Sequence, residues 1–127
     1  MSKGLKGITV KIDGDTKPLN QALSKVNAET KSLQGELKGI NSLLKFDPKN
    51  TELLAQKQTV LSKAIEQTES KLKTLEQAQK QMAEAGKDVN DEAYRDLQRE
   101  IFLTKKKLAD YNVELENTQA QKKQTAK

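Results

Sequence analysis

Apolar residues recur at alternating intervals of four and three along three long stretches of this chain. Each stretch keeps the spacing for about four heptads, which is long enough to predict a helix rather than a chance pattern. A narrow apolar stripe on a long helix can be buried only against another helix. The sequence therefore predicts a mainly α-helical fold in which three long helices pack as an antiparallel coiled coil or helical bundle.

The residues expected to form these helix seams are mostly leucine and isoleucine. They are Leu19, Leu23, Val26, Leu33, Leu37, Ile40, Leu44, Leu54, Leu61, Ile65, Leu72, Leu75, Met82, Tyr94, Leu97, Ile101, Leu108, Tyr111 and Leu115. Polar residues interrupt the seams at Thr30, Gln58, Thr68, Gln79, Thr104 and Thr118. Buried polar seam positions weaken association while fixing register or copy number. The alternative interpretation is that these layers lie near the surface and are merely tolerated.

Turn-forming residues divide the chain into segments. The predicted boundaries are a strand and turn over 1–16, helices over 17–46, 51–85 and 91–118, turns over 47–50 and 86–90, and a polar, frayed tail over 119–127. Pro48 disfavours helical geometry in the residue before it, and Asn50 or Thr51 can cap the helix that follows. So short a connection predicts antiparallel neighbours, with Phe46 filling the corner of the hairpin.

Two features of the first half of the chain allow more than one interpretation. Ile8, Val10 and Ile12 alternate with polar residues and predict a short strand. Such a strand pairs with another copy, pairs with sequence outside this chain, or stays unpaired. Gly35 and Gly39 share one face of the first predicted helix, where they indicate either a close helix contact or a local weak point.

The composition narrows the possible functions. Only 34 % of the 127 residues are hydrophobic and 3 % are aromatic, which suits narrow seams better than a thick core. Cysteine and histidine are absent, so the usual general base, thiolate nucleophile and transition-metal ligands are missing. No glycine-rich loop follows the predicted strand. We therefore expect no enzyme activity, catalytic residue, cofactor, metal or small-molecule substrate, and no apolar run predicts a membrane span.

The net charge of +5 is spread along the chain rather than gathered in a basic block. The longest basic run, residues 105–107, covers most of one helical turn and does not form a stripe. A sequence-independent nucleic-acid binder would cluster its basic residues on one face. The distribution therefore argues against nucleic acid as a partner, although non-specific nucleic-acid binding stays as one alternative function.

Three segments carry a resemblance to a known family. They are GITVKIDGDTKPLNQAL over 7–23, LKGINSLLKFDPKNTELLAQKQTVLSKAI over 37–65 and DEAYRDLQREI over 91–101. The stretch over 7–108 resembles the N-terminal region of tail tape measure proteins from phages and prophages of Gram-positive bacteria. The segment over 43–58 is the most specific part of this resemblance, and the strand followed by Gly14, Asp15 and Thr16 is the second signature.

The resemblance implies a structural protein of virion assembly. Members of that family extend inside the growing tail tube and set its length, while tube subunits stack around them with the help of chaperones. The implied partners are further copies of the chain, tail-tube subunits and tail-assembly chaperones, first in the bacterial host cytoplasm and then in the virion tail. A helical-hairpin binding module similar to the chaperone prefoldin is the other alternative function.

Overall fold

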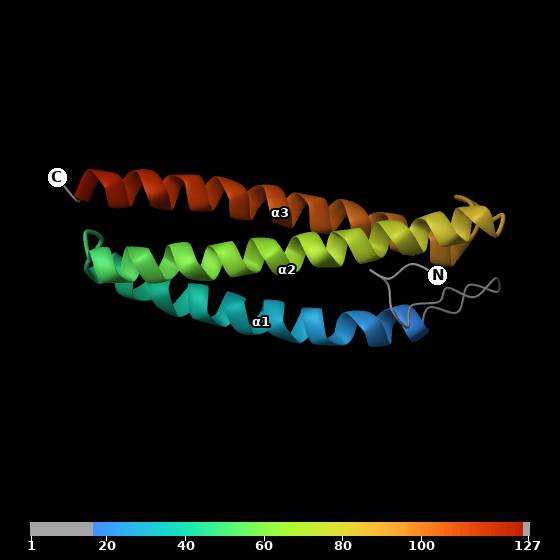
Figure 1. Ribbon diagram of the computed structural model, residues 1–127, viewed down its shortest axis with the longest axis horizontal. Helices are drawn as coiled ribbons and strands as arrows, with labels where there is room; N and C mark the ends of the chain where they lie inside the picture. The colour runs from blue at the N-terminus through green and yellow to red at the C-terminus, as the bar shows by residue number, and fades with distance from the viewer. Residues whose placement is uncertain (1–16, 126–127) are drawn as a thin grey trace.

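A computed structural model describes residues 17–125 of the chain, and these residues form three long helices. The helices are α1 over Lys17–Phe46, α2 over Thr51–Glu84 and α3 over Glu92–Thr125. They lie side by side with α2 in the middle, and successive helices run in opposite directions (Figure 1). The prediction of three long, packed helices is confirmed, whereas the predicted strand with Ile8, Val10 and Ile12 lies outside the described residues.

Both turns end or begin a helix with a recognisable local interaction. The Asn50 side chain accepts a hydrogen bond from the Leu53 amide at 3.0 Å, which satisfies one of the free amides in the first turn of α2. At the other end of α2, Gly86 adopts a φ of 87°, a conformation that glycine reaches without steric cost. The Lys87 amide then donates to the Met82 carbonyl at 2.9 Å and closes the helix end. The predicted cap at Asn50 is confirmed.

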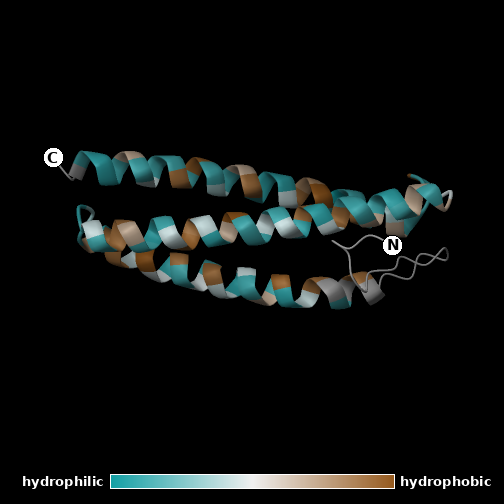
Figure 2. Ribbon diagram, viewed as in Figure 1, coloured by the Kyte–Doolittle hydropathy of each residue, from teal (hydrophilic) through white to brown (hydrophobic). Residues whose placement is uncertain are grey.

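The core consists of two apolar clusters, one toward each end of the three helices. Apolar residues alternate with polar ones along each helix, as the narrow seams require (Figure 2). The cluster near the α2–α3 turn contains Leu19, Leu23, Leu75, Ala78, Met82, Leu97 and Ile101. The cluster near the α1–α2 turn contains Leu37, Ile40, Val60, Leu61, Ala64 and Tyr111. Because α2 lies between two neighbours, it contributes to both clusters over a wider face than a two-helix seam needs.

The expected position of Phe46 is wrong, because its side chain is 90 % exposed. Phe46 is the last residue of α1 and follows the seam residue Leu44 by two positions. Two positions correspond to about 200° around a helix, so the ring points away from the seam. The aromatic side chain of Phe46 therefore lies on the outer surface of the hairpin corner.

The predicted frayed tail also differs from the structure, in which α3 continues to Thr125. Gln121 donates from its side-chain amide to the Pro48 carbonyl at 3.2 Å, and the Lys122 ammonium lies 3.5 Å from the Gln58 side-chain oxygen. Thr118 is buried just before these contacts. The polar tail therefore stays helical because it packs on the start of α2, which its composition did not reveal.

Gly35 and Gly39 lie on the surface of α1. A Cβ atom built on either glycine would have no heavy atom within 4 Å. The close-contact interpretation is therefore wrong, and the pair is a local weak point of the helix. A separate observation concerns membranes: none of the described helices has an apolar stretch long enough to cross a bilayer.

Candidate functional site

The predicted seam residues are the candidate site, since association between helices is the chemistry that this sequence specifies. None of them is exposed in the structure. The buried ones are Leu19, Leu23, Leu37, Ile40, Leu54, Leu61, Leu75, Met82, Leu97, Ile101 and Tyr111. The half-buried ones are Val26, Leu33, Leu44, Ile65, Leu72, Tyr94, Leu108 and Leu115. The structure thus brings the predicted stripes of all three helices together along the inside of the bundle.

Three buried positions of α2, Val60, Ala64 and Ala78, were not among the predicted seam residues. Ala78 is 0 % exposed, whereas the expected Gln79 is half-buried and directs its side-chain amide to the Tyr94 hydroxyl at 3.4 Å. Ala78 follows Leu75 by three positions and precedes Met82 by four, so its spacing fits the seam as well as that of Gln79 does. Its small apolar side chain was the signal that favoured it.

A layer of threonines separates the two apolar clusters. Thr30 of α1, Thr68 of α2 and Thr104 of α3 line one hollow near the middle of the bundle. The hydroxyl of Thr68 donates to the Ala64 carbonyl at 2.7 Å, and that of Thr104 donates to the Glu100 carbonyl at 2.7 Å. Further along α3, Thr118 makes the same intrahelical bond to Glu114 at 2.8 Å.

These hydrogen bonds explain how a narrow apolar seam contains hydroxyl groups. A threonine that bonds to the carbonyl four residues earlier is satisfied within its own helix and needs no partner on a neighbour. Only the Thr30 hydroxyl oxygen, among the described residues, is buried without a hydrogen-bond partner. The expectation that these layers lie near the surface is wrong for Thr68, Thr104 and Thr118, which are buried. They are tolerated inside the bundle because each hydroxyl bonds within its own helix, and no hydrogen bond between these hydroxyls fixes the register of the helices.

Ion pairs along the bundle edge connect α2 with α3. Lys57 lies 3.3 Å from Glu114, Lys71 lies 3.1 Å from Glu100, and Lys105 lies 3.8 Å from Glu76. All six side chains keep some solvent exposure, so each pair contributes at most about 1 kcal/mol. Among the described residues, the ion pairs between helices all join α2 to α3. The contact between α1 and α3 is instead a hydrogen bond from the Gln34 side-chain amide to the Tyr111 hydroxyl at 3.2 Å.

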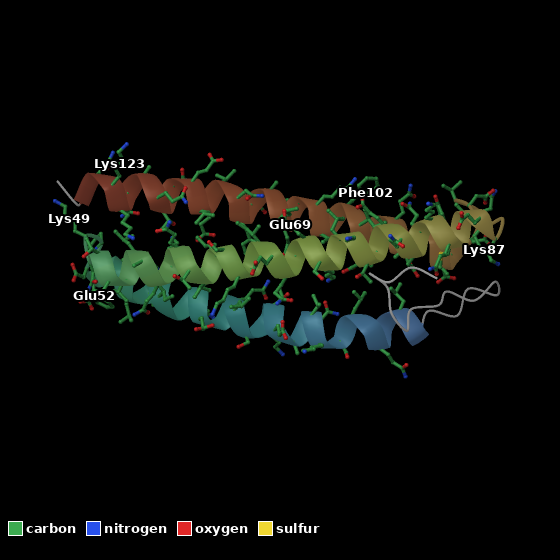
Figure 3. The ribbon with its side chains drawn as sticks, in the orientation of Figure 1. Lys49, Glu52, Glu69, Lys87, Phe102 and Lys123 are labelled. Atoms are coloured by element: carbon green, nitrogen blue, oxygen red, sulfur yellow. The ribbon has the colours of Figure 1, made fainter. Side chains whose placement is uncertain are left out.

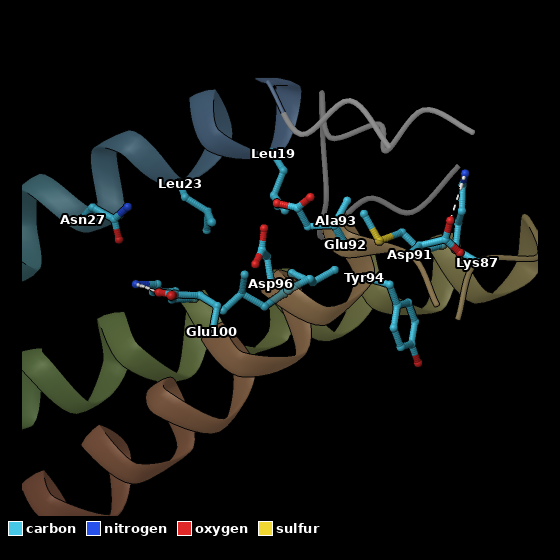
Figure 4. A pocket seen from close by; sticks show the side chains of 14 residues that line it. Leu19, Leu23, Asn27, Lys87, Asp91, Glu92, Ala93, Tyr94, Asp96 and Glu100 are labelled. Carbon is cyan, nitrogen blue, oxygen red and sulfur yellow. Dashed lines mark ion pairs between the residues drawn. The ribbon is translucent and has the colours of Figure 1, made fainter. Parts of the chain in front are cut away.

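An open groove runs between α1 and α3. One hollow of this groove, of about 740 Å³, lies near the α2–α3 turn. Figure 4 shows Leu19 and Leu23 on one side of this hollow and the carboxylates of Glu92 and Asp96 on the other. Lys71 pairs with Glu100 along the same wall. The groove thus combines an apolar floor with a charged rim.

The described part of the chain offers no group of histidine, cysteine or acidic residues that could hold a metal ion. Its carboxylates lie along helix surfaces, where several of them pair with lysines three or four residues away or on the neighbouring helix. Comparisons with protein-family models, with curated proteins and with solved structures find no match to this chain.

Proposed function

We propose that the chain is a structural assembly protein, the N-terminal coiled-coil segment of a phage tail tape measure protein that helps to set tail length during assembly of the tail tube. One observation carries the proposal. The most specific part of the resemblance, residues 43–58, coincides with the end of α1, the turn capped by Asn50 and the start of α2. The residues that resemble the family are thus also the residues that fold the chain back on itself.

The lengths of the helices define what this segment contributes to such a protein. The two helices of 34 residues, α2 and α3, are each about 51 Å long, and α1 with 30 residues is about 45 Å long. The same described residues in one unbroken helix would extend for about 160 Å. The folded segment therefore serves as a compact end of the tape, which associates with other copies and with tail components. The length of the tape itself would come from sequence beyond this segment.

The proposed partners follow from this role. Further copies of the chain, tail-tube subunits and tail-assembly chaperones would contact the helix surfaces rather than a pocket. Assembly would take place in the cytoplasm of the bacterial host, and the protein would then reside in the virion tail. The proposal assigns no catalytic step and no cofactor to these residues.

Immunogold electron microscopy of purified particles tests the role directly. Antibodies raised against residues 17–125 would be applied to particles from an induced host strain that encodes the chain, with opened tails to expose the lumen. We expect gold label on tails and none on particles from a strain in which the gene is deleted. Label that stays in the cell lysate while the tails remain unlabelled would contradict the proposal.

One observation favours the second candidate, a helical-hairpin binding module. Phe46 and Leu43 are 90 % and 55 % exposed at the α1–α2 turn, which gives this end of the bundle an apolar tip. Such a tip could hold an unfolding client by its apolar segments. The assay is suppression of client aggregation by the wild-type chain and by Phe46→Ser. Loss of suppression in that variant, with suppression kept in Phe102→Ser on α3, would favour this candidate over the assembly role.

A further inference from the structure

A second stripe runs along α3 on the side away from α2. Its central residues are Arg99, Phe102, Lys106, Ala109, Val113 and Glu116, again at alternating intervals of three and four, and all are exposed. Phe102 and Val113 are 61 % and 57 % exposed. Phe102 lies on the outer side of the helix in Figure 3. We call these six residues the outer face of α3.

We propose that the outer face of α3 pairs with the same face of a second copy in an antiparallel, two-fold symmetric arrangement. The inference deepens the proposed self-association and rests on it. The register that we assign sets Phe102 against Val113 of the second copy, and the two-fold axis repeats this contact on the other side. Two exposed apolar side chains of each copy are then covered by one another, as in an antiparallel coiled-coil seam.

The charges on this face select the antiparallel orientation. In the assigned register, Arg99 meets Glu116 of the second copy. Lys106 meets the neutral Ala109 and lies near its own equivalent across the two-fold axis, where its ion pair with Asp110 at 3.0 Å offsets the like charge. A parallel pairing in register would instead set Arg99, Lys106 and Glu116 each against its own equivalent. Like charges that face each other disfavour association. Of the two arrangements, antiparallel and parallel in register, only the antiparallel one brings opposite charges together.

The assigned register also uses nearly the whole helix. Toward its ends it sets Arg95 against Ala120 of the second copy, and both residues are exposed in the single chain. Arg99 already pairs with Asp96 on its own helix, but a guanidinium has five N–H donors and can bind both carboxylates. The dimer interface thus leaves the inner seam of α3 free to pack on α2.

Charge exchange in the 127-residue chain tests the pairing. We expect Glu116→Arg and Arg99→Glu each to raise the dissociation constant of the dimer about tenfold in sedimentation equilibrium, because each creates like-charge contacts. The double variant restores opposite charges and should return to within about twofold of wild type. Glu69→Arg, a charge reversal on the exposed side of α2, is the matched control and should change nothing. Circular dichroism checks that each variant stays helical.

Single cysteines test the orientation, since the chain has none of its own. Lys106→Cys lies close to the two-fold axis and should form a disulfide-linked dimer under mild oxidation. Arg95→Cys should not link to itself, because the two copies of residue 95 lie about 37 Å apart along the axis. A mixture of Arg95→Cys with Ala120→Cys should link readily. Ser70→Cys on α2 is the control that should stay unlinked.

Two results would overturn the inference. If the double charge variant associates no better than the single ones, or if Arg95→Cys links to itself, then this face or this orientation is wrong. If either result occurs while the wild-type chain still forms a dimer, the proposed self-association stands, but it uses another surface. A chain that stays monomeric at all concentrations would overturn both the interface and the self-association, while the tail location is tested separately by electron microscopy.

Discussion

Two leucines illustrate how position rather than residue type decides the energetics of this chain. Leu75 on α2 is 1 % exposed within the cluster near the α2–α3 turn, whereas Leu103 on α3 is 59 % exposed. Burial of an apolar side chain supplies most of its contribution to stability, and truncation also leaves a cavity. The same substitution should therefore lower the free energy of unfolding strongly at Leu75 and hardly at all at Leu103.

We expect Leu75→Ala to lower the free energy of unfolding by about 2–5 kcal/mol. Leu103→Ala, a change of the same size on an exposed helix position, should alter it by less than about 0.5 kcal/mol. Urea denaturation followed by circular dichroism measures both. Equal losses in the two variants would show that the packing of α2 against its neighbours is misassigned.

The threonine layer offers a second comparison at the scale of single atoms. The buried Thr30 hydroxyl has no partner among the described residues, whereas the Thr68 hydroxyl bonds to a carbonyl of its own helix. Replacing threonine by valine removes the hydroxyl and keeps the shape. Thr30→Val should therefore raise the free energy of unfolding by about 1 kcal/mol, because an unsatisfied polar group leaves the core.

Thr68→Val is the matched control, and its effect should be smaller because it also loses a satisfied hydrogen bond. Thermal unfolding of the two variants beside wild type makes the comparison. A larger gain for Thr68→Val than for Thr30→Val would contradict the assignment of Thr30 as the unsatisfied member of the layer.

At the scale of elements, glycines show how the same residue weakens one segment and supports another. Gly35 lies in the middle of α1 with free space around it, and Gly86 ends α2 with a φ of 87°. We expect Gly35→Ala to stabilise the chain by up to about 1 kcal/mol, because alanine is the better helix former. Gly86→Ala should destabilise it by about 1 kcal/mol, since alanine disfavours positive φ.

Differential scanning calorimetry of the two variants gives opposite shifts of the melting temperature if this account is right. A lower melting temperature for Gly35→Ala would mean that α1 makes a close contact at this glycine after all.

The helices themselves could be predicted from the sequence because their signals are local. The seam spacing, the cap at Asn50 and the glycine near the end of α2 each act within a few residues, and the predicted bounds of α1 coincide with the observed ones. The exposure of Phe46 could also have been predicted, because its angle to the seam follows from its position two residues after Leu44. The helical tail after Thr118 could not, because it depends on contacts with residues more than sixty positions earlier.

The candidate site was predictable to a similar degree. The stripe residues could be identified individually because an apolar side chain on a solvated helix needs cover. The choice of Ala78 over Gln79 was also within reach, since both fit the spacing and only Ala78 is apolar. Composition could not reveal that Thr68 and Thr104 bond within their own helices, because that depends on the side-chain rotamer.

At the scale of the whole molecule, the two outer helices are held to α2 in different ways. The three ion pairs between helices in the described part of the chain all join α2 to α3. In addition, α1 has two solvent-exposed glycines in the middle of its length. Segments with fewer stabilising contacts open at lower free energy than the rest of a fold.

We therefore expect the backbone amides of α1 to exchange with deuterium faster than those of α2 and α3. Hydrogen exchange with mass spectrometry resolves the three helices, and Gly35→Ala should slow exchange in α1 more than elsewhere. Uniform protection along all three helices would contradict this ranking.

Two hydroxyls of the threonine layer, those of Thr68 and Thr104, bond within their own helices, and this has a consequence for how the chain recognises itself. Because the hydroxyls of Thr68 and Thr104 make no bond to a neighbouring helix, this layer does not distinguish a helix of the same molecule from the equivalent helix of another molecule. The hairpins stay within one molecule because the turns over 47–50 and 85–91 hold each helix beside its neighbour at a high effective concentration. The short turns, rather than the threonine layer, therefore set which helix lies beside which, and they oppose the exchange of whole helices between molecules.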